Sequence, residues 1–160
     1  VYGFLWGGSS GTGWNLVLTA YYSLIAGRFR FKTGSDITNT RLHCGLFSAE
    51  TFNDDVGALH HTGLVFSSVR GDVNWQLTSK DGTTARLLDS GVVVAANTRY
   101  VVDYRITPTQ VSISINGGAW TTKTTNPPGT AIPLGAAIAG CTTAASSRHV
   151  LVEDITLQCY

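Results

Sequence analysis

The segment from Arg99 to Lys123 constrains the fold most, because it holds three short runs separated by two turn signals. Alternate residues of the first two runs are apolar: Tyr100, Val102, Tyr104 and Ile106, then Val111, Ile113 and Ile115. Successive strand side chains point to opposite faces, so this alternation predicts half-buried strands. Pro108 marks the first break, and Asn116 with Gly117 supplies the second, a favoured hairpin turn. The segment predicts a three-stranded antiparallel meander.

The rest of the chain follows the same pattern. With 18 Gly and no Met, the composition suits strands and turns rather than helices. Short alternating runs with turn signals recur along the 160 residues, so we expect one domain over 1–160, of eleven or twelve strands. Residues 148–159 carry apolar side chains on both faces, which predicts a central strand. The fold expected is all-β, a two-sheet antiparallel jelly-roll sandwich with no substantial helix.

Charge and cysteine usage exclude some classes of partner. Eleven basic and ten acidic residues are scattered singly, so no basic stripe suits nucleic acid. No apolar run reaches the roughly 18 residues of a spanning helix, so we expect no membrane insertion. Cys44, Cys141 and Cys159 allow one disulfide in three ways, or none, which leaves the compartment open. The chain begins at Val1, so it either lost an initiator Met or is part of a longer chain.

An acidic loop is the one candidate metal site. Residues 48–57 are the most polar stretch of the chain, and four of them carry oxygen ligands suited to calcium: Glu50, Asn53, Asp54 and Asp55. The same residue types are common in any exposed turn. We expect a plain turn and no cofactor, with calcium as the alternative.

Two tryptophans are candidates for binding a sugar or receptor. Trp120 follows the Asn-Gly turn, and Trp14 follows the Gly-rich loop at 7–13. The alternative for each is packing in the core or at a subunit interface, where large apolar rings are common.

Residues 28–32 alternate basic and aromatic side chains, which predicts an ordinary strand with Phe29 and Phe31 inside and three cations in water.

The N-terminal region is the expected oligomer interface. Residues classed as hydrophobic make up 43% of the chain, more than one small sandwich is expected to hide. Residues 1–26 are therefore interpreted as an interface or connecting segment. Its expected contact residues are Leu5, Trp6, Tyr21 and Tyr22.

Catalysis is not expected. Glycoside hydrolysis needs two carboxyl groups facing each other across a cleft. The chain has only Glu50 and Glu153 as glutamates, and Glu153 and Asp154 should point to opposite faces of a strand.

Several segments together resemble the concanavalin A-like lectin/glucanase jelly roll. They are a Trp-bearing strand that ends in Asp-Gly (Trp75 to Gly82), the meander with Tyr-x-x-x-Tyr-x-Ile and Val-x-Ile-x-Ile-Asn-Gly, and the closing Val152 to Leu157. The resemblance implies glycan binding through a calcium-binding loop and an aromatic ring stacked on the sugar. In this chain the loop would be residues 50–55, and the ring would be Trp120 or Trp14. The Glu-x-Asp-x-x-Glu motif of the glucanases is absent.

The Gly, Thr and Ser-rich texture is also similar to bacteriophage virion modules, which are tail-fibre tips, head fibres and capsid decoration proteins. That similarity implies a homotrimer that contacts other virion proteins. The function expected is a non-enzymatic virion surface protein that decorates the particle or binds the host cell. The alternative is a carbohydrate-binding, lectin-like module of a longer secreted protein, with a cell-surface glycan as partner.

Overall fold

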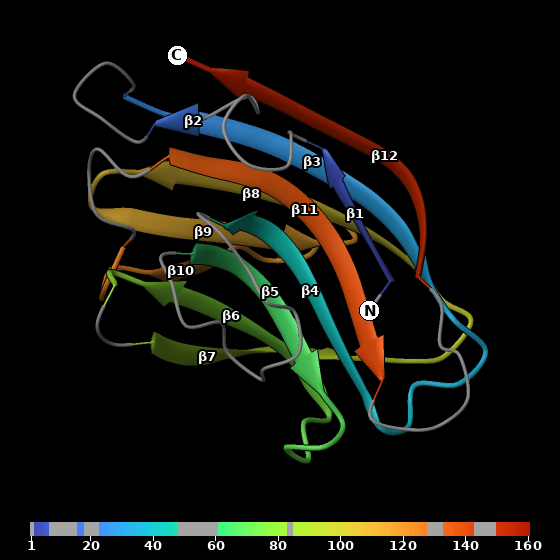
Figure 1. The fold of residues 1–160 in the computed structure, drawn as a ribbon. Helices are drawn as coiled ribbons and strands as arrows, with labels where there is room; N and C mark the ends of the chain where they lie inside the picture. Colours follow the sequence, from blue (N-terminus) through green and yellow to red (C-terminus); the bar gives the residue numbers. More distant parts are fainter. Residues whose placement is uncertain are drawn as a thin grey trace.

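The computed structural model describes residues 2–6, 16–17, 23–47, 61–82, 85–127, 133–142 and 150–160. These residues form twelve strands in two antiparallel sheets that face each other (Figure 1). The described residues include no helix, and so none long and apolar enough to cross a membrane. The prediction of an all-β, two-sheet jelly-roll sandwich is confirmed.

The larger sheet has seven strands. Its order is β1 (Tyr2–Trp6), β11 (Pro133–Thr142), β4 (Thr40–Phe47), β5 (His61–Ser67), β6 (Asn74–Lys80) and β7 (Ala85–Val93), and the short β2 (Leu16–Val17) also pairs with β11. Segments distant in sequence therefore lie side by side, since β11 separates β1 from β4.

The smaller sheet has five strands and carries the meander. Its order is β10 (Thr121–Lys123), β9 (Gln110–Ile115), β8 (Arg99–Thr107), β3 (Ile25–Thr33) and β12 (Val150–Cys159). The two turns lie where the sequence predicts them, and Asn116 and Gly117 both have positive φ, at 52° and 71°. The Gly118 N–H donates to the Ile115 carbonyl at 3.0 Å, which closes the second turn.

The core lies between the two sheets. The inward residues of the meander are buried as predicted, from Tyr100 to Ile115 along alternate positions. Trp75 of β6 is completely buried and makes edge contacts with Phe31 and Tyr100 of the opposite sheet. Such aromatic pairs add about 0.5–1.5 kcal/mol each beyond the burial of their apolar area. They fix the two sheets relative to each other.

The prediction that the last strand is central is wrong. β12 is an edge strand that pairs only with β3 among the described strands, and its Leu151 is 59% exposed. Its outward apolar residue lies in solvent, which a single exposed side chain tolerates. The β12–β3 register shifts between Val152 and Asp154, which marks a β-bulge in this edge.

One hydroxyl connects the two sheets. Tyr104 of β8 accepts a hydrogen bond from the Leu64 N–H at 2.8 Å and donates one to the Cys44 carbonyl. Leu64 and Cys44 are opposite each other on β5 and β4, so the hydroxyl reaches between two paired strands. Burial raises the pKa of Tyr104 well above its usual value, so the hydroxyl keeps the proton that it donates. Cys44 is a free thiol and is buried in the core.

Among the described strands, β7 is at the edge of the larger sheet, and its pairing is irregular. It spans residues 85–93, and its register shifts between Asn74 and Gln76 of its partner β6. Asp89 holds this bulge, because its carboxylate accepts from the Gly91 N–H at 2.6 Å and from the side-chain amides of Asn74 and Gln76. The Gly91 N–H, followed by Gln76, lowers the pKa of Asp89.

We therefore expect Asp89→Asn to lower the urea midpoint of unfolding at neutral pH. A carboxyl group whose pKa is lowered by folding stabilises the fold above its unfolded pKa and loses that contribution as the pH falls through its folded pKa. Below that pH the wild type is protonated too, so the midpoints of the two proteins should converge. Urea titrations at neutral pH and at a pH well below the usual aspartate pKa measure this. A difference that persists in acid would show that charge at Asp89 does not matter.

Part of the expected oligomer interface is a strand of the sandwich. β1 pairs with β11, so that Leu5 is opposite Ala137 and Trp6 is opposite Ala136. β1 is therefore at the edge of the larger sheet. Tyr21 and Tyr22 are outside the described residues. The interface stays a prediction.

Candidate functional site

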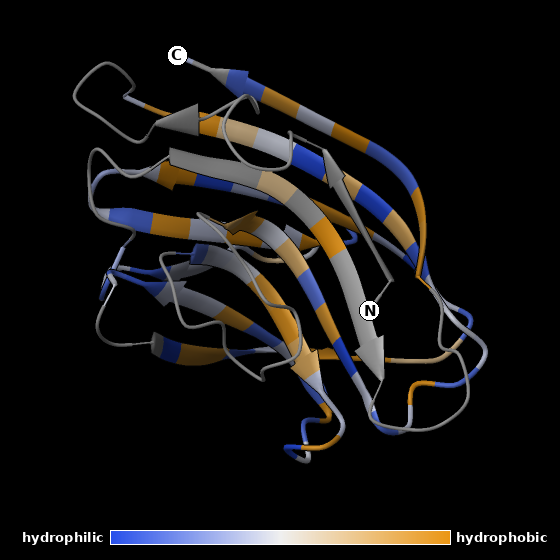
Figure 2. Cartoon of the chain, viewed as in Figure 1, coloured by the Kyte–Doolittle hydropathy of each residue, from blue (hydrophilic) through white to orange (hydrophobic). Residues whose placement is uncertain are grey.

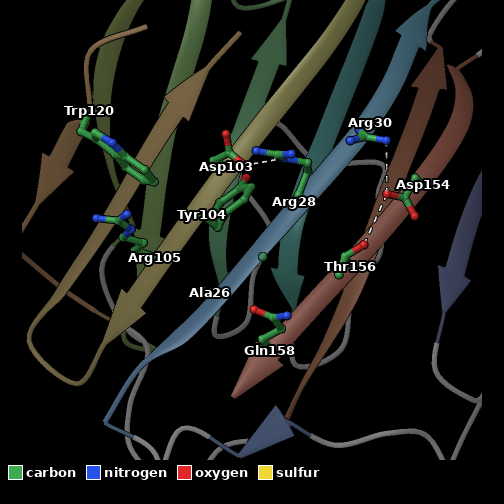
Figure 3. Close-up of a pocket in the computed structure, with 11 residues that line it drawn as sticks. Ala26, Arg28, Arg30, Asp103, Tyr104, Arg105, Trp120, Asp154, Thr156 and Gln158 are labelled. Carbon is green, nitrogen blue, oxygen red and sulfur yellow. Dashed lines mark hydrogen bonds and ion pairs between the residues drawn. The ribbon is translucent and has the colours of Figure 1, made fainter. Parts of the chain in front are cut away.

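A groove crosses the outer face of the smaller sheet. It has a volume of about 420 Å³ and is lined by residues of β3, β8 and β12 together with Trp120 (Figure 3). Polar and apolar residues alternate along β3, as the colouring of this strand in Figure 2 shows. Phe29 and Phe31 are buried, while Arg28 and Arg30 are exposed on the outer face. The alternation that builds the core on one face therefore builds a polar surface on the other.

Strand register places the lining side chains in rows. Ala26 of β3 is opposite Arg105 of β8 on one side and Gln158 of β12 on the other. Adjacent strands are about 4.8 Å apart, so the two long side chains begin about 10 Å apart with only a methyl group between them. Ala26 is thus the floor of a hollow whose walls are Arg105 and Gln158, as Figure 3 shows.

The next two rows carry ion pairs. Arg28 Nε donates to Asp103 Oδ1 at 2.7 Å, and Arg30 Nη1 is 4.0 Å from Asp154 Oδ2. The hydrogen bond from Arg28 to Asp103, and then the charge of Asp103, raises the pKa of Arg28 above its usual value. The Arg28–Asp103 pair is half-exposed, at 47% and 23% of its side-chain areas, so it orients the groove wall more than it stabilises the fold.

The bulge in β12 corrects one prediction about carboxylates. Glu153 and Asp154 should point to opposite faces of a regular strand. Instead Glu153 is paired with Arg99 Nε at 2.7 Å, and Asp154 is near Arg30. Both carboxylates therefore lie beside arginines of the outer face. A bulge places two residues of one strand opposite one of its partner, and this makes the shared face possible. Of the two, Asp154 lines the groove.

Trp120 is brought to the groove by the turn that precedes β10. The side chain of Asn116 accepts from the Val101 N–H at 2.9 Å, which attaches this turn to β8. Ser114 donates to the Gly118 carbonyl at 2.7 Å, so the turn continues across the outer face of β9. Trp120 is then 41% exposed, and the Arg105 guanidinium carbon is 4.4 Å from its ring centroid. This cation–π contact aligns the two side chains at one end of the groove.

Of the residues that the sequence marks as candidates, the structure places Trp120 in this groove. Trp14 and the four residues of the acidic loop, Glu50, Asn53, Asp54 and Asp55, are outside the described residues. Within the described ranges, no group of three or more His, Cys, Asp or Glu could hold a metal ion. His61 is buried, and its Nε2 is 3.0 Å from the Thr78 hydroxyl.

Sequence reasoning missed most of the groove. Arg28 and Arg30 were predicted to be outward, but as solvated cations rather than as walls of a site. Their partners on β8 and β12 are about 75 and 125 residues away in sequence, and only the strand order brings them together. The available signal was the polar half of each alternating strand, namely Arg28, Asp103, Arg105, Thr156 and Gln158.

Comparison with known proteins shows the fold. No protein-family model and no curated protein matches the chain. Among solved structures, it is similar to a toad ovary galectin in complex with thio-digalactose, with a TM-score of 0.59, 13% identity and 98% of both chains covered. A second is sheep galectin-11 in complex with glycerol, with a TM-score of 0.58, 10% identity and coverage of 90% of this chain and 94% of the galectin.

The chain is also similar to an alginate lyase of polysaccharide lyase family 7, with a TM-score of 0.60 and 10% identity over 91% of this chain. It spans 64% of that lyase. Galectins and these lyases share the concanavalin A-like jelly roll, so the predicted resemblance in fold is confirmed. At such identities the likeness extends to the fold and not to function.

Proposed function

We propose that this chain is a non-enzymatic carbohydrate-binding module, and that the groove across β3, β8 and β12 binds the glycan. The observation that carries the proposal is the hollow over Ala26, which has long polar walls and an exposed indole at one end. Its volume of about 420 Å³ is within the range of roughly 300–1,000 Å³ typical of small-molecule sites.

The lining matches the chemistry of a sugar. A pyranose presents hydroxyl groups around its rim and C–H groups on its faces, so it needs hydrogen-bonding partners and an apolar surface together. Arg28, Gln158 and Asp103 provide donors and acceptors, while Trp120 provides an amphipathic ring. All the polar groups except Trp120 are on strands of a sheet, which preorganises them. The galectin fold, seen with thio-digalactose in the toad protein, supports this assignment.

The absence of catalysis is part of the proposal. The groove carboxylates Asp103 and Asp154 are each near an arginine, at 2.7 Å and 4.0 Å. Glycoside hydrolysis needs two carboxyl groups that face each other across a cleft, and each of these two faces an arginine instead. The likeness to alginate lyases makes this worth testing, and incubation with the bound glycan should leave its chain length unchanged.

The setting of the module stays a prediction. A homotrimer on the surface of a phage particle and a lectin-like part of a longer secreted protein would both use a glycan-binding groove. Glycan binding is supported by the groove and by the likeness in fold to galectins. The virion setting rests only on the Gly-, Thr- and Ser-rich composition of the sequence. Native mass by light scattering, with and without a calcium chelator, tests the trimer and the alternative of a calcium loop.

A glycan array identifies the ligand, and Trp120→Ala then tests the site. We expect the substitution to weaken binding about tenfold or more, or about 1.4 kcal/mol, because it removes the exposed indole at one end of the groove. Leu151→Ala is the matched control, since it removes another large exposed side chain from the same sheet outside the groove lining. Titration calorimetry measures both. Equal affinities for wild type and Trp120→Ala, or a chain that binds no glycan, would contradict the proposal.

A further inference from the structure

We propose that the glycan is acidic, and that Arg105 binds its carboxylate or sulphate group over the Ala26 hollow. This inference rests on the proposed function and names the class of ligand. It follows from the way in which Arg105 is held, from the groups that surround it, and from the charge of the groove.

Arg105 is presented as an anion receptor. Its guanidinium carbon is 4.4 Å from the centroid of the Trp120 ring, and the side chain has no carboxylate partner or hydrogen-bond acceptor among the described residues. The cation–π contact restricts the position of the guanidinium. No protein acceptor among the described residues occupies its N–H donors, so they are available to a ligand. A planar carboxylate can then accept two parallel hydrogen bonds from the guanidinium, the strongest arrangement for this pair.

Donors also surround the hollow on its other sides. Gln158 is opposite Arg105 across Ala26, and its side-chain oxygen accepts from the Tyr160 hydroxyl at 2.6 Å. This contact leaves the amide nitrogen of Gln158 as the group available to a ligand. Arg28 is two residues after Ala26 on β3. Its Nε donates to Asp103, so its two terminal nitrogens remain available to donate to a ligand. Three donor side chains around one hollow suit a ligand group that only accepts.

The charge balance favours an anion as well. The lining includes three arginines, Arg28, Arg30 and Arg105, against two aspartates, Asp103 and Asp154, which leaves one positive charge. Each aspartate is near Arg28 or Arg30, so the uncompensated charge belongs to Arg105. A neutral sugar would leave that cation without a partner, and an acidic sugar would neutralise it.

The test uses glycan pairs that differ only in charge. One arm compares an oligogalacturonate with its methyl ester, and the other compares a sulphated galactan oligosaccharide with its desulphated form. The full chain and three variants are titrated against each member. Arg105→Gln removes both the positive charge and the pair of parallel N–H donors. Arg105→Lys keeps the charge but not the paired donors. Arg99→Gln removes an arginine of the same strand that is paired with Glu153 outside the groove lining.

We expect at least about tenfold tighter binding of the acidic member in one arm, which identifies the anion as carboxylate or sulphate. Arg105→Gln should abolish this preference, Arg105→Lys should restore it in part, and Arg99→Gln should leave it unchanged. High salt should weaken binding of the acidic member more than that of the neutral one.

Two results would overturn the inference, and they are distinguishable. If the neutral members bind as tightly as the acidic ones and Arg105→Gln changes nothing, the ligand is not recognised by charge, while glycan binding itself stands. If no member of either pair binds, and a wider array of neutral and acidic glycans is also negative, both the inference about an acidic ligand and the proposal of glycan binding are wrong.

Discussion

Replacing Ala26 by glutamine is expected to weaken glycan binding about 30-fold or more while leaving the fold intact. Ala26 is the small side chain between Arg105 and Gln158, so a longer side chain at this position occupies the hollow itself. The position is on the partly exposed outer face, where glutamine can extend without entering the core. Loss of the subsite should cost about 2 kcal/mol or more, or about 30-fold in affinity. Titration calorimetry with the glycan found on the array measures it.

Ala96→Gln is the matched control, because it makes the same change at an exposed position outside the groove lining. Thermal unfolding of both variants checks that neither disturbs the sandwich. If Ala26→Gln is stable and binds with wild-type affinity, the hollow over Ala26 is not the binding site.

The largest effect on stability is expected from Tyr104→Phe. The substitution removes one hydroxyl and leaves the Leu64 N–H and the Cys44 carbonyl without the partner that they have in the native fold. A buried polar group without a partner costs about 1–3 kcal/mol, so two should lower the free energy of unfolding by about 2–6 kcal/mol. That is a large share of the roughly 5–15 kcal/mol that stabilises most domains.

Urea unfolding followed by tryptophan fluorescence measures this change, since Trp75 is in the same core. Tyr160→Phe is the control, because it removes the same atom from a side chain that is 62% exposed. We expect it to stay within about 0.5 kcal/mol of the wild type. A loss of similar size in both variants would mean that the buried Tyr104 hydroxyl contributes no more to the free energy of unfolding than the exposed Tyr160 hydroxyl does.

The sequence was sufficient for most of the fold, because alternation reports burial directly. Tyr100 to Ile115 is buried at the predicted positions, and Asn116 turns the chain where the sequence predicts. The sequence was misleading where a strand departs from regular geometry. The bulge in β12 brings Glu153 and Asp154 to one face, and an edge strand was interpreted as central because Leu151 is apolar although it is exposed.

The groove itself could be predicted only in part. Trp120 stands out beside a turn, but alternation says which face Arg105 is on and not which residue lies across from it. The pairing of Arg105, Ala26 and Gln158 depends on strand order, since β3 separates β8 from β12 although the three segments are far apart in sequence. Local pattern specifies each strand, and the topology that assembles the site is set by non-local packing.

Amide NMR spectra of the isotope-labelled protein, recorded during titration with the glycan, test most directly whether this groove is the site. We expect the shifts to be confined to the outer row of the smaller sheet, at Ala26, Arg105 and Gln158, and to the turn at Trp120. The larger sheet offers the comparison, with Gln76 and Thr78 on β6 as reporters. Shifts centred on β6 with an unchanged Ala26 row would place the glycan on the opposite sheet and contradict the proposed site.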